Sequence, residues 1–123
     1  MTVDSIATQL TFLFTPLRLG LAAFFLFLSY KAISGDASVV QDFERWGYPG
    51  TFRVFTGACQ AFGAIALAVP QTSLWGAGIL LIVLAGATLT HLLHDPWTSL
   101  ASPLIVLALV LLATLPGAQE ALR

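Results

Sequence analysis

Charged residues are scarce in this chain: five Lys and Arg and six Asp and Glu make up 9% of its 123 residues. A soluble domain carries about a quarter of such residues, so the shortage excludes an ordinary water-soluble protein. The formal net charge of -1 provides no basic surface that could neutralise several phosphates at once. Nucleic acid is therefore excluded as a partner.

Cysteine is almost absent, because Cys59 is the single one in the sequence. The chain can form no intramolecular disulfide, and the two-cysteine chemistry of membrane thiol oxidases is excluded. Apolar residues are abundant instead, at 58% of the chain, with a mean hydropathy of +0.90. This balance predicts a protein that resides in a lipid bilayer.

Four apolar stretches approach the roughly 17 to 25 helical residues that cross a bilayer. They cover about residues 10–33, 52–69, 74–93 and 100–115, and proline with polar turn formers interrupts them at 70–73 and 95–99. We predict an all-α fold: one domain over residues 1–123, an integral membrane four-helix bundle, multi-pass, in the cell membrane. The first helix is expected to be retained, because the residues before it carry no Lys or Arg.

The connection between the first two stretches has a helical pattern of its own. Ser38 and Gln41 have the spacing of a capping box, and four apolar residues share one face of the expected helix: Val39, Val40, Phe43 and Trp46. This pattern predicts a short helix lying in the membrane interface.

Polar residues inside the expected membrane spans are the best functional evidence, because an unpartnered polar group costs free energy in hydrocarbon. Arg18 lies about eight residues into the first stretch and Gln60 about eight into the second. Antiparallel packing would bring them to similar depths in the membrane, so the geometry allows a hydrogen bond between their side chains. It either holds two helices together or belongs to a site completed by an anionic lipid or substrate group.

His91 has Thr88 and Asp95 at helical spacing. It either exchanges protons near neutral pH or is an interfacial residue bonded to Asp95 or a backbone carbonyl. With His94 alone nearby, the donor set for a metal or haem is incomplete, so no metal site is predicted.

Two further features have alternative interpretations. Lys31, at the end of the first stretch, is either a snorkelling anchor or a ligand contact. Four small residues form a stripe that predicts close helix packing, either inside one bundle or in a homo-oligomer: Gly57, Ala61, Ala64 and Ala68.

Ordered landmarks along the chain resemble the DoxX-like family of small four-helix membrane proteins, over about residues 12–113. They are LRLG at 17–20, residues 25–31 and 43–49, FTGACQ at 55–60 and ATLTH at 87–91. The resemblance implies a membrane protein that accompanies redox proteins, as some members are similar to the membrane subunit of thiosulfate:quinone oxidoreductases. Distant relatives act as assembly chaperones or cargo receptors.

Carried over by position, the recurrent polar landmarks of the family are Arg18, Lys31, position 60 and His91. The family pattern leads us to expect an acidic residue at position 60, where this chain has Gln60. The substitution removes a counter-ion for Arg18.

Two hypotheses follow. In the first, the chain is a redox-associated membrane subunit whose polar pocket holds a quinone or related lipid, with electrons supplied by a membrane or peripheral redox protein. The candidate ligand-binding residues are Arg18, Lys31, Trp46, Gln60 and His91; no catalytic residue is assigned. In the second, it is a non-catalytic adaptor, chaperone or assembly factor whose loop residues Arg45, Trp46 and Tyr48 dock a partner. A proton-coupled exporter is disfavoured, because every acidic residue lies in a loop or at a helix end.

Overall fold

The computed structural model describes residues 3–114, with side chains at residue 9 and from residue 15 onward. The helices are α1 (Val3–Ser34), α2 (Ala37–Trp46), α3 (Gly50–Ala68), α4 (Ser73–His94) and α5 (Ala101–Ala113), with short 3-10 helices η1 (Pro70–Thr72) and η2 (Trp97–Leu100). No strand occurs over these residues. The prediction of an all-α fold is confirmed.

Three segments are long and apolar enough to cross a membrane: Thr15–Ser34, Gly50–Ala68 and Pro70–His94. They coincide with the first three predicted spans, except that helix α1 begins at Val3, well before residue 10. The fourth apolar segment, Trp97–Ala113, is shorter, and the predicted end of that span at residue 115 lies outside the described residues. The fourth crossing therefore stays a prediction.

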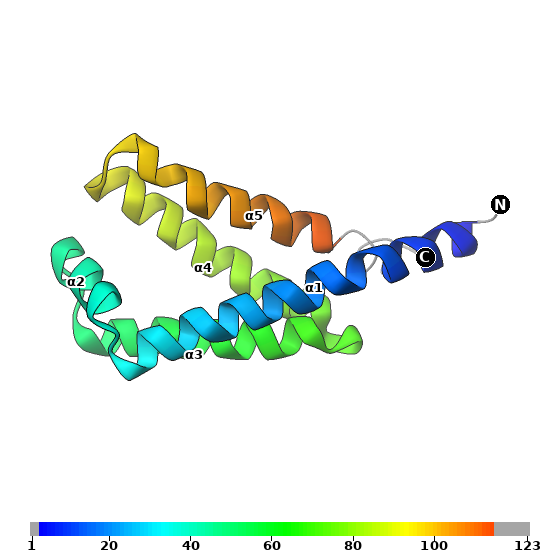
Figure 1. The fold of residues 1–123 in the computed structure, drawn as a ribbon, viewed down its shortest axis with the longest axis horizontal. Helices are drawn as coiled ribbons and strands as arrows, with labels where there is room; N and C mark the ends of the chain where they lie inside the picture. The colour runs from blue at the N-terminus through cyan, green and yellow to red at the C-terminus, as the bar shows by residue number, and fades with distance from the viewer. Residues whose placement is uncertain (1–2, 115–123) are drawn as a thin grey trace.

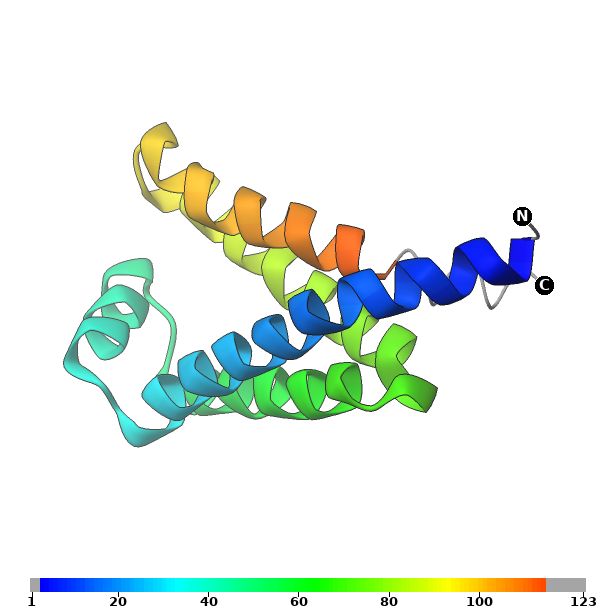
Figure 2. The same cartoon turned by 45° about the vertical axis from the view of Figure 1, so that its right-hand side comes forward.

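The long helices form a bundle in which α3 packs against both α1 and α4, and α5 packs against α4 and α1. One fully buried side chain from each of these four helices meets in the core: Phe25, Leu67, Leu80 and Val110. In both views the α1–α3 pair and the α4–α5 pair diverge toward one end of the molecule, and α2 lies at that end (Figures 1 and 2). We call it the loop end.

The predicted small-residue stripe on α3 packs inside the bundle. Gly57 and Ala64 are buried, and a Cβ added at Gly57 would lie 3.0 Å from the Cβ of Ala32. Large apolar side chains point outward instead, including Phe62 at 70% and Ile82 at 75% exposure. An outer surface as apolar as this suits contact with lipid tails.

Helix α2 begins differently from its predicted start. Its N-cap is Asp36, not Ser38, and the carboxylate accepts hydrogen bonds from the backbone N–H and the hydroxyl of Ser38. The negative charge of Asp36 is also stabilised by the positive end of the helix dipole. Gly47, at φ 81°, ends the helix in the left-handed conformation. The predicted apolar face is confirmed as half-buried, and its position in the membrane interface stays a prediction.

Candidate functional site

A cavity of about 170 Å³ lies between the four long helices. Its lining is mostly apolar, with three polar side chains from three helices: Gln60 of α3, His91 of α4 and Ser102 of α5. The apolar lining residues are Phe24, Phe25, Leu28, Val83, Leu84, Ala87, Pro103 and Val106. A cavity of this kind can hold a small apolar ring while a few polar groups fix its orientation.

Two of the five candidate residues, Gln60 and His91, are brought together by this cavity. Ser102 was not singled out from the sequence. The Ser102–Pro103 pair interrupts the apolar run of α5, and a polar residue inside an apolar stretch is the signal that could have identified it.

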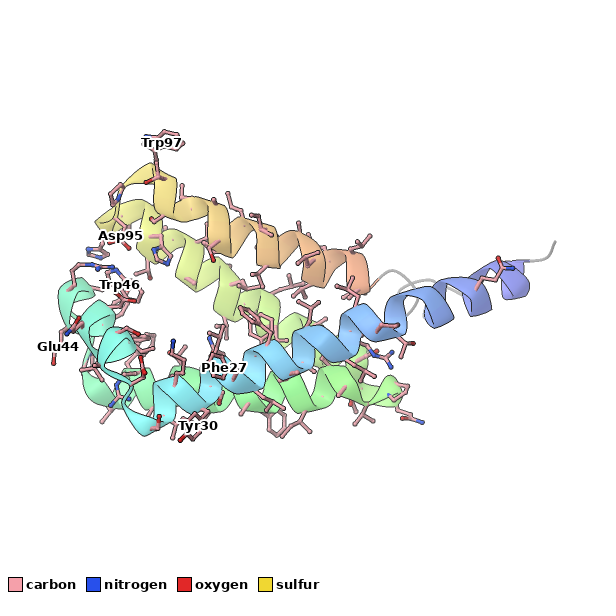
Figure 3. All side chains as sticks on the ribbon, viewed as in Figure 1. Phe27, Tyr30, Glu44, Trp46, Asp95 and Trp97 are labelled. Carbon is pink, nitrogen blue, oxygen red and sulfur yellow. The ribbon has the colours of Figure 1, made fainter. Side chains whose placement is uncertain are left out.

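The ring of His91 forms a hydrogen bond with Asp95, four residues further along the chain. His91 Nδ1 lies 2.7 Å from Asp95 Oδ2, as the helical spacing predicts. The Oδ2 atom also accepts hydrogen bonds from Trp46 Nε1 at 3.1 Å and from Arg45 Nη2 at 3.2 Å. Arg45 Nη2 forms an ion pair with the other carboxylate oxygen, Oδ1, at 3.0 Å. Trp46 and Asp95 face one another at the loop end in Figure 3.

The Asp95 carboxylate is nearly enclosed, with its side chain 7% exposed. This burial favours the neutral acid and by itself would raise the pKa. Hydrogen bonds from His91 and Trp46 and the positive charge of Arg45 outweigh it, so the pKa of Asp95 lies below its ordinary value. Asp95 is consequently ionised at neutral pH.

Aromatic residues attach α2 and the following loop to α4. The indole of Trp46 lies edge-on to the imidazole of His91, with ring centroids 5.3 Å apart. The hydroxyl of Tyr48 shares a 2.9 Å hydrogen bond with the buried Thr90. Trp46, a candidate ligand residue, thus contacts His91 but is not part of the cavity lining.

Lys31 lies at the loop end of α1 and does not line the cavity. Its ammonium group is 4.0 Å from the carboxylate of Asp36 and 5.6 Å from the ring centroid of Phe27, which Figure 3 labels. These contacts are those of a helix-end anchor that covers an aromatic side chain.

Arg18 does not lie at the cavity either. The hydroxyl of Ser29 donates to the backbone oxygen of Gly57 at 2.7 Å, and this antiparallel register puts Gln60 level with about residue 26 of α1. Arg18 is eight residues further along, or about 12 Å. No hydrogen bond joins Arg18 to Gln60 among the described residues, and the Nε of Arg18 is buried without a hydrogen-bond partner there.

Across the part of the chain that the structure describes, no three His, Cys, Asp or Glu side chains are grouped so as to hold a metal ion. The site is therefore a mostly apolar cavity with one amide (Gln60), one imidazole (His91) and one hydroxyl (Ser102) in its lining. The imidazole is hydrogen-bonded to the carboxylate of Asp95, which pairs with Arg45.

Comparison with known proteins identifies the class. Residues 17–113 match the DoxX-like family, and the chain belongs to that family. Together with its three long apolar helices, this makes it an integral membrane protein. Searches of the curated proteins and of the solved structures found no match.

Proposed function

We propose that this DoxX-like protein is the quinone-linked membrane subunit of a redox system, multi-pass in the cell membrane, and that its cavity holds the quinone ring. The observation that carries the proposal is the convergence of Gln60 and His91 on one otherwise apolar cavity. A quinone ring has the matching chemistry, because it is flat and apolar with two hydrogen-bond acceptors.

The size of the cavity supports a single-ring ligand. An apolar protein cavity of about 150 Å³ binds benzene, and the cavity here measures about 170 Å³. Phe24 lines the cavity and is also 42% exposed on the outer surface of α1. The isoprenoid tail of the quinone would pass the ring of Phe24 and extend into the lipid.

The side chains have distinct roles in this proposal. A quinone accepts two electrons and two protons when it is reduced. The Gln60 amide donates a hydrogen bond to one ring oxygen, and His91, in its protonated form, donates the Nε2 proton to the other. The second proton comes from water. Because the sequence has one cysteine and no recognisable cofactor motif, the electrons are proposed to come from a partner redox protein.

An adaptor role has weaker support. The residues expected to dock a partner are already engaged within the chain, since Arg45 and Trp46 bond to Asp95 and Tyr48 bonds to Thr90. Trp46 and Tyr48 are partly buried by these contacts, which leaves less of their side-chain surface for another protein.

Mass spectrometry of small molecules extracted from gently purified protein tests the proposed function. We expect a quinone in the wild type and about two- to tenfold less in Gln60→Leu, because one lost hydrogen bond costs about 0.5–1.5 kcal/mol. Gln71→Leu is the matched control, since Gln71 is exposed in η1 and its replacement should leave the quinone content unchanged. A wild type without quinone, or equal contents in Gln60→Leu and Gln71→Leu, would contradict the proposal.

A further inference from the structure

We infer that Asp95 is a positioning residue, which fixes the proton of neutral His91 on Nδ1 and thereby presents Nε2 to the ligand cavity. The inference deepens the proposed function, on which it rests for the identity of the ligand. The ring geometry itself stands on contacts that need no ligand.

A hydrogen bond joins the side chains of His91 and Asp95. An ionised carboxylate has acceptors and no donor, so in the 2.7 Å contact with Asp95 Oδ2 the Nδ1 atom of His91 must donate. A neutral imidazole carries one ring proton. With that proton on Nδ1, Nε2 has a free lone pair.

Two residues of α2 keep Asp95 ionised and in place. The Arg45 guanidinium supplies the opposite charge at 3.0 Å, and Trp46 donates a further hydrogen bond. Trp46 also contacts the imidazole edge-on, so the ring of His91 is restrained both by a hydrogen bond and by packing. Helix α2 thereby supports a side chain of α4 from a segment more than 40 residues away in the sequence.

The other ring nitrogen of His91, Nε2, differs from Nδ1 in its contacts. His91 lines the cavity, and among the described residues its Nε2 has no hydrogen-bond partner, whereas Nδ1 is occupied by Asp95. Nε2 is thus the atom available to a ligand. It accepts a hydrogen bond when His91 is neutral and donates one when His91 is protonated.

Nitrogen-15 NMR of histidine-labelled protein in detergent tests the inference without any quinone. The chain contains two histidines, so His94→Gln leaves His91 as the single ring in the spectrum. At a pH where the ring is neutral, we expect the Nδ1–H tautomer in His94→Gln and a shift to Nε2–H when Asp95→Leu is added, because leucine removes the acceptor that holds the proton on Nδ1. Asp42→Asn, which removes another carboxylate that pairs with Arg45, should leave the tautomer unchanged.

The Nε2–H tautomer in His94→Gln would overturn the inference, and so would a spectrum that Asp95→Leu does not alter. If the leucine variant fails to fold, the His94→Gln spectrum alone still decides between the two tautomers. The two proposals fail separately: a protein that carries no quinone but shows Nδ1–H refutes the ligand and leaves the positioning role of Asp95 intact.

Discussion

A glycine in α4 sets the distance at which two helices can pack. A Cβ added at Gly76 would lie 2.5 Å from the backbone oxygen of Gly63 and would also collide with the backbone nitrogen of Leu67. Backbone atoms cannot move aside as the end of a flexible side chain can. Gly76 therefore allows α3 and α4 the close approach that small residues give to helices in membranes.

Substitution at this position should be costly. We expect Gly76→Ala to lower the free energy of unfolding by about 1–3 kcal/mol or more, the range found for overpacked cores. Gly78 is the matched control, because a Cβ there meets nothing within 4 Å, and Gly78→Ala should be neutral or stabilising by up to about 1 kcal/mol. Thermal unfolding in detergent measures both, and equal stability of the two variants would contradict the packing account.

The sequence did not distinguish these two glycines. Spacing predicted that the small residues of α3 pack closely, as Gly57 and Ala64 do. However, Gly76 and Gly78 lie in the same apolar run, and which of them faces α3 depends on how α4 is rotated. That rotation is fixed by packing with the other helices and not by local pattern.

At the scale of elements, one carboxylate joins α2 to the end of α4. Asp95 accepts hydrogen bonds from Trp46 and Arg45 of α2 and from His91 of α4. Helix α2 has no fully buried residue. These polar bonds therefore hold it together with the aromatic contacts of Phe43 with Phe52 and of Trp46 with His91. The attachment of α2 should therefore respond to the ionisation of Asp95.

Acid should weaken this attachment. The folded pKa of Asp95 lies below its ordinary value of 3.8, so the unfolded chain takes up the proton first as the pH falls. The stability contributed by this group is fully present above about pH 4 and is lost as the pH falls through the folded pKa. We expect Asp95→Asn to be less stable than the wild type at neutral pH, with thermal unfolding curves that converge below pH 4.

The control for this titration is Asp42→Asn, whose carboxylate is 45% exposed. It should show a small stability difference from the wild type at every pH. A difference between wild type and Asp95→Asn that stays constant from neutral pH to acid would show that the ionisation of Asp95 does not hold α2.

The local sequence pattern predicted the bounds of the helices better than the contacts between them. Helices α3 and α4 begin and end within two residues of the predicted spans 52–69 and 74–93, because proline and polar turns mark their boundaries. The His91 to Asp95 contact also followed from helical spacing. The contact of Trp46 with Asp95 joins residues 49 positions apart, and no periodicity within either helix indicates it.

At the scale of the whole molecule, α2 and η1 lie at opposite ends of α3 (Figure 1). If α3 crosses the bilayer, residues in these two segments face different aqueous compartments. In a Cys59→Ala background, we expect Gln41→Cys and Gln71→Cys to react with a membrane-impermeant maleimide from opposite sides of sealed vesicles. Reaction of both from the same side would contradict the crossing by α3.

The sequence did not determine the axial register of α1 against α3, which decides which of their residues lie at the same depth. Counting from the apolar boundaries put Arg18 and Gln60 at similar depths, but the bond from Ser29 to Gly57 sets Arg18 level with the end of α3. These depths were counted from predicted span starts at residues 10 and 52. The axial register of two apolar helices depends instead on the contacts between their side chains. The cavity consequently gathers Gln60 with His91 and Ser102 instead.

Photolabelling with an azido-quinone would locate the quinone ring in the protein. We expect covalent label on residues that line the cavity, in the segments 24–28, 83–91 or 102–106, and loss of that label when excess unmodified quinone competes. Label confined to outward-facing residues such as Phe62 and Trp75, or label that unmodified quinone does not displace, would contradict a quinone site between the helices.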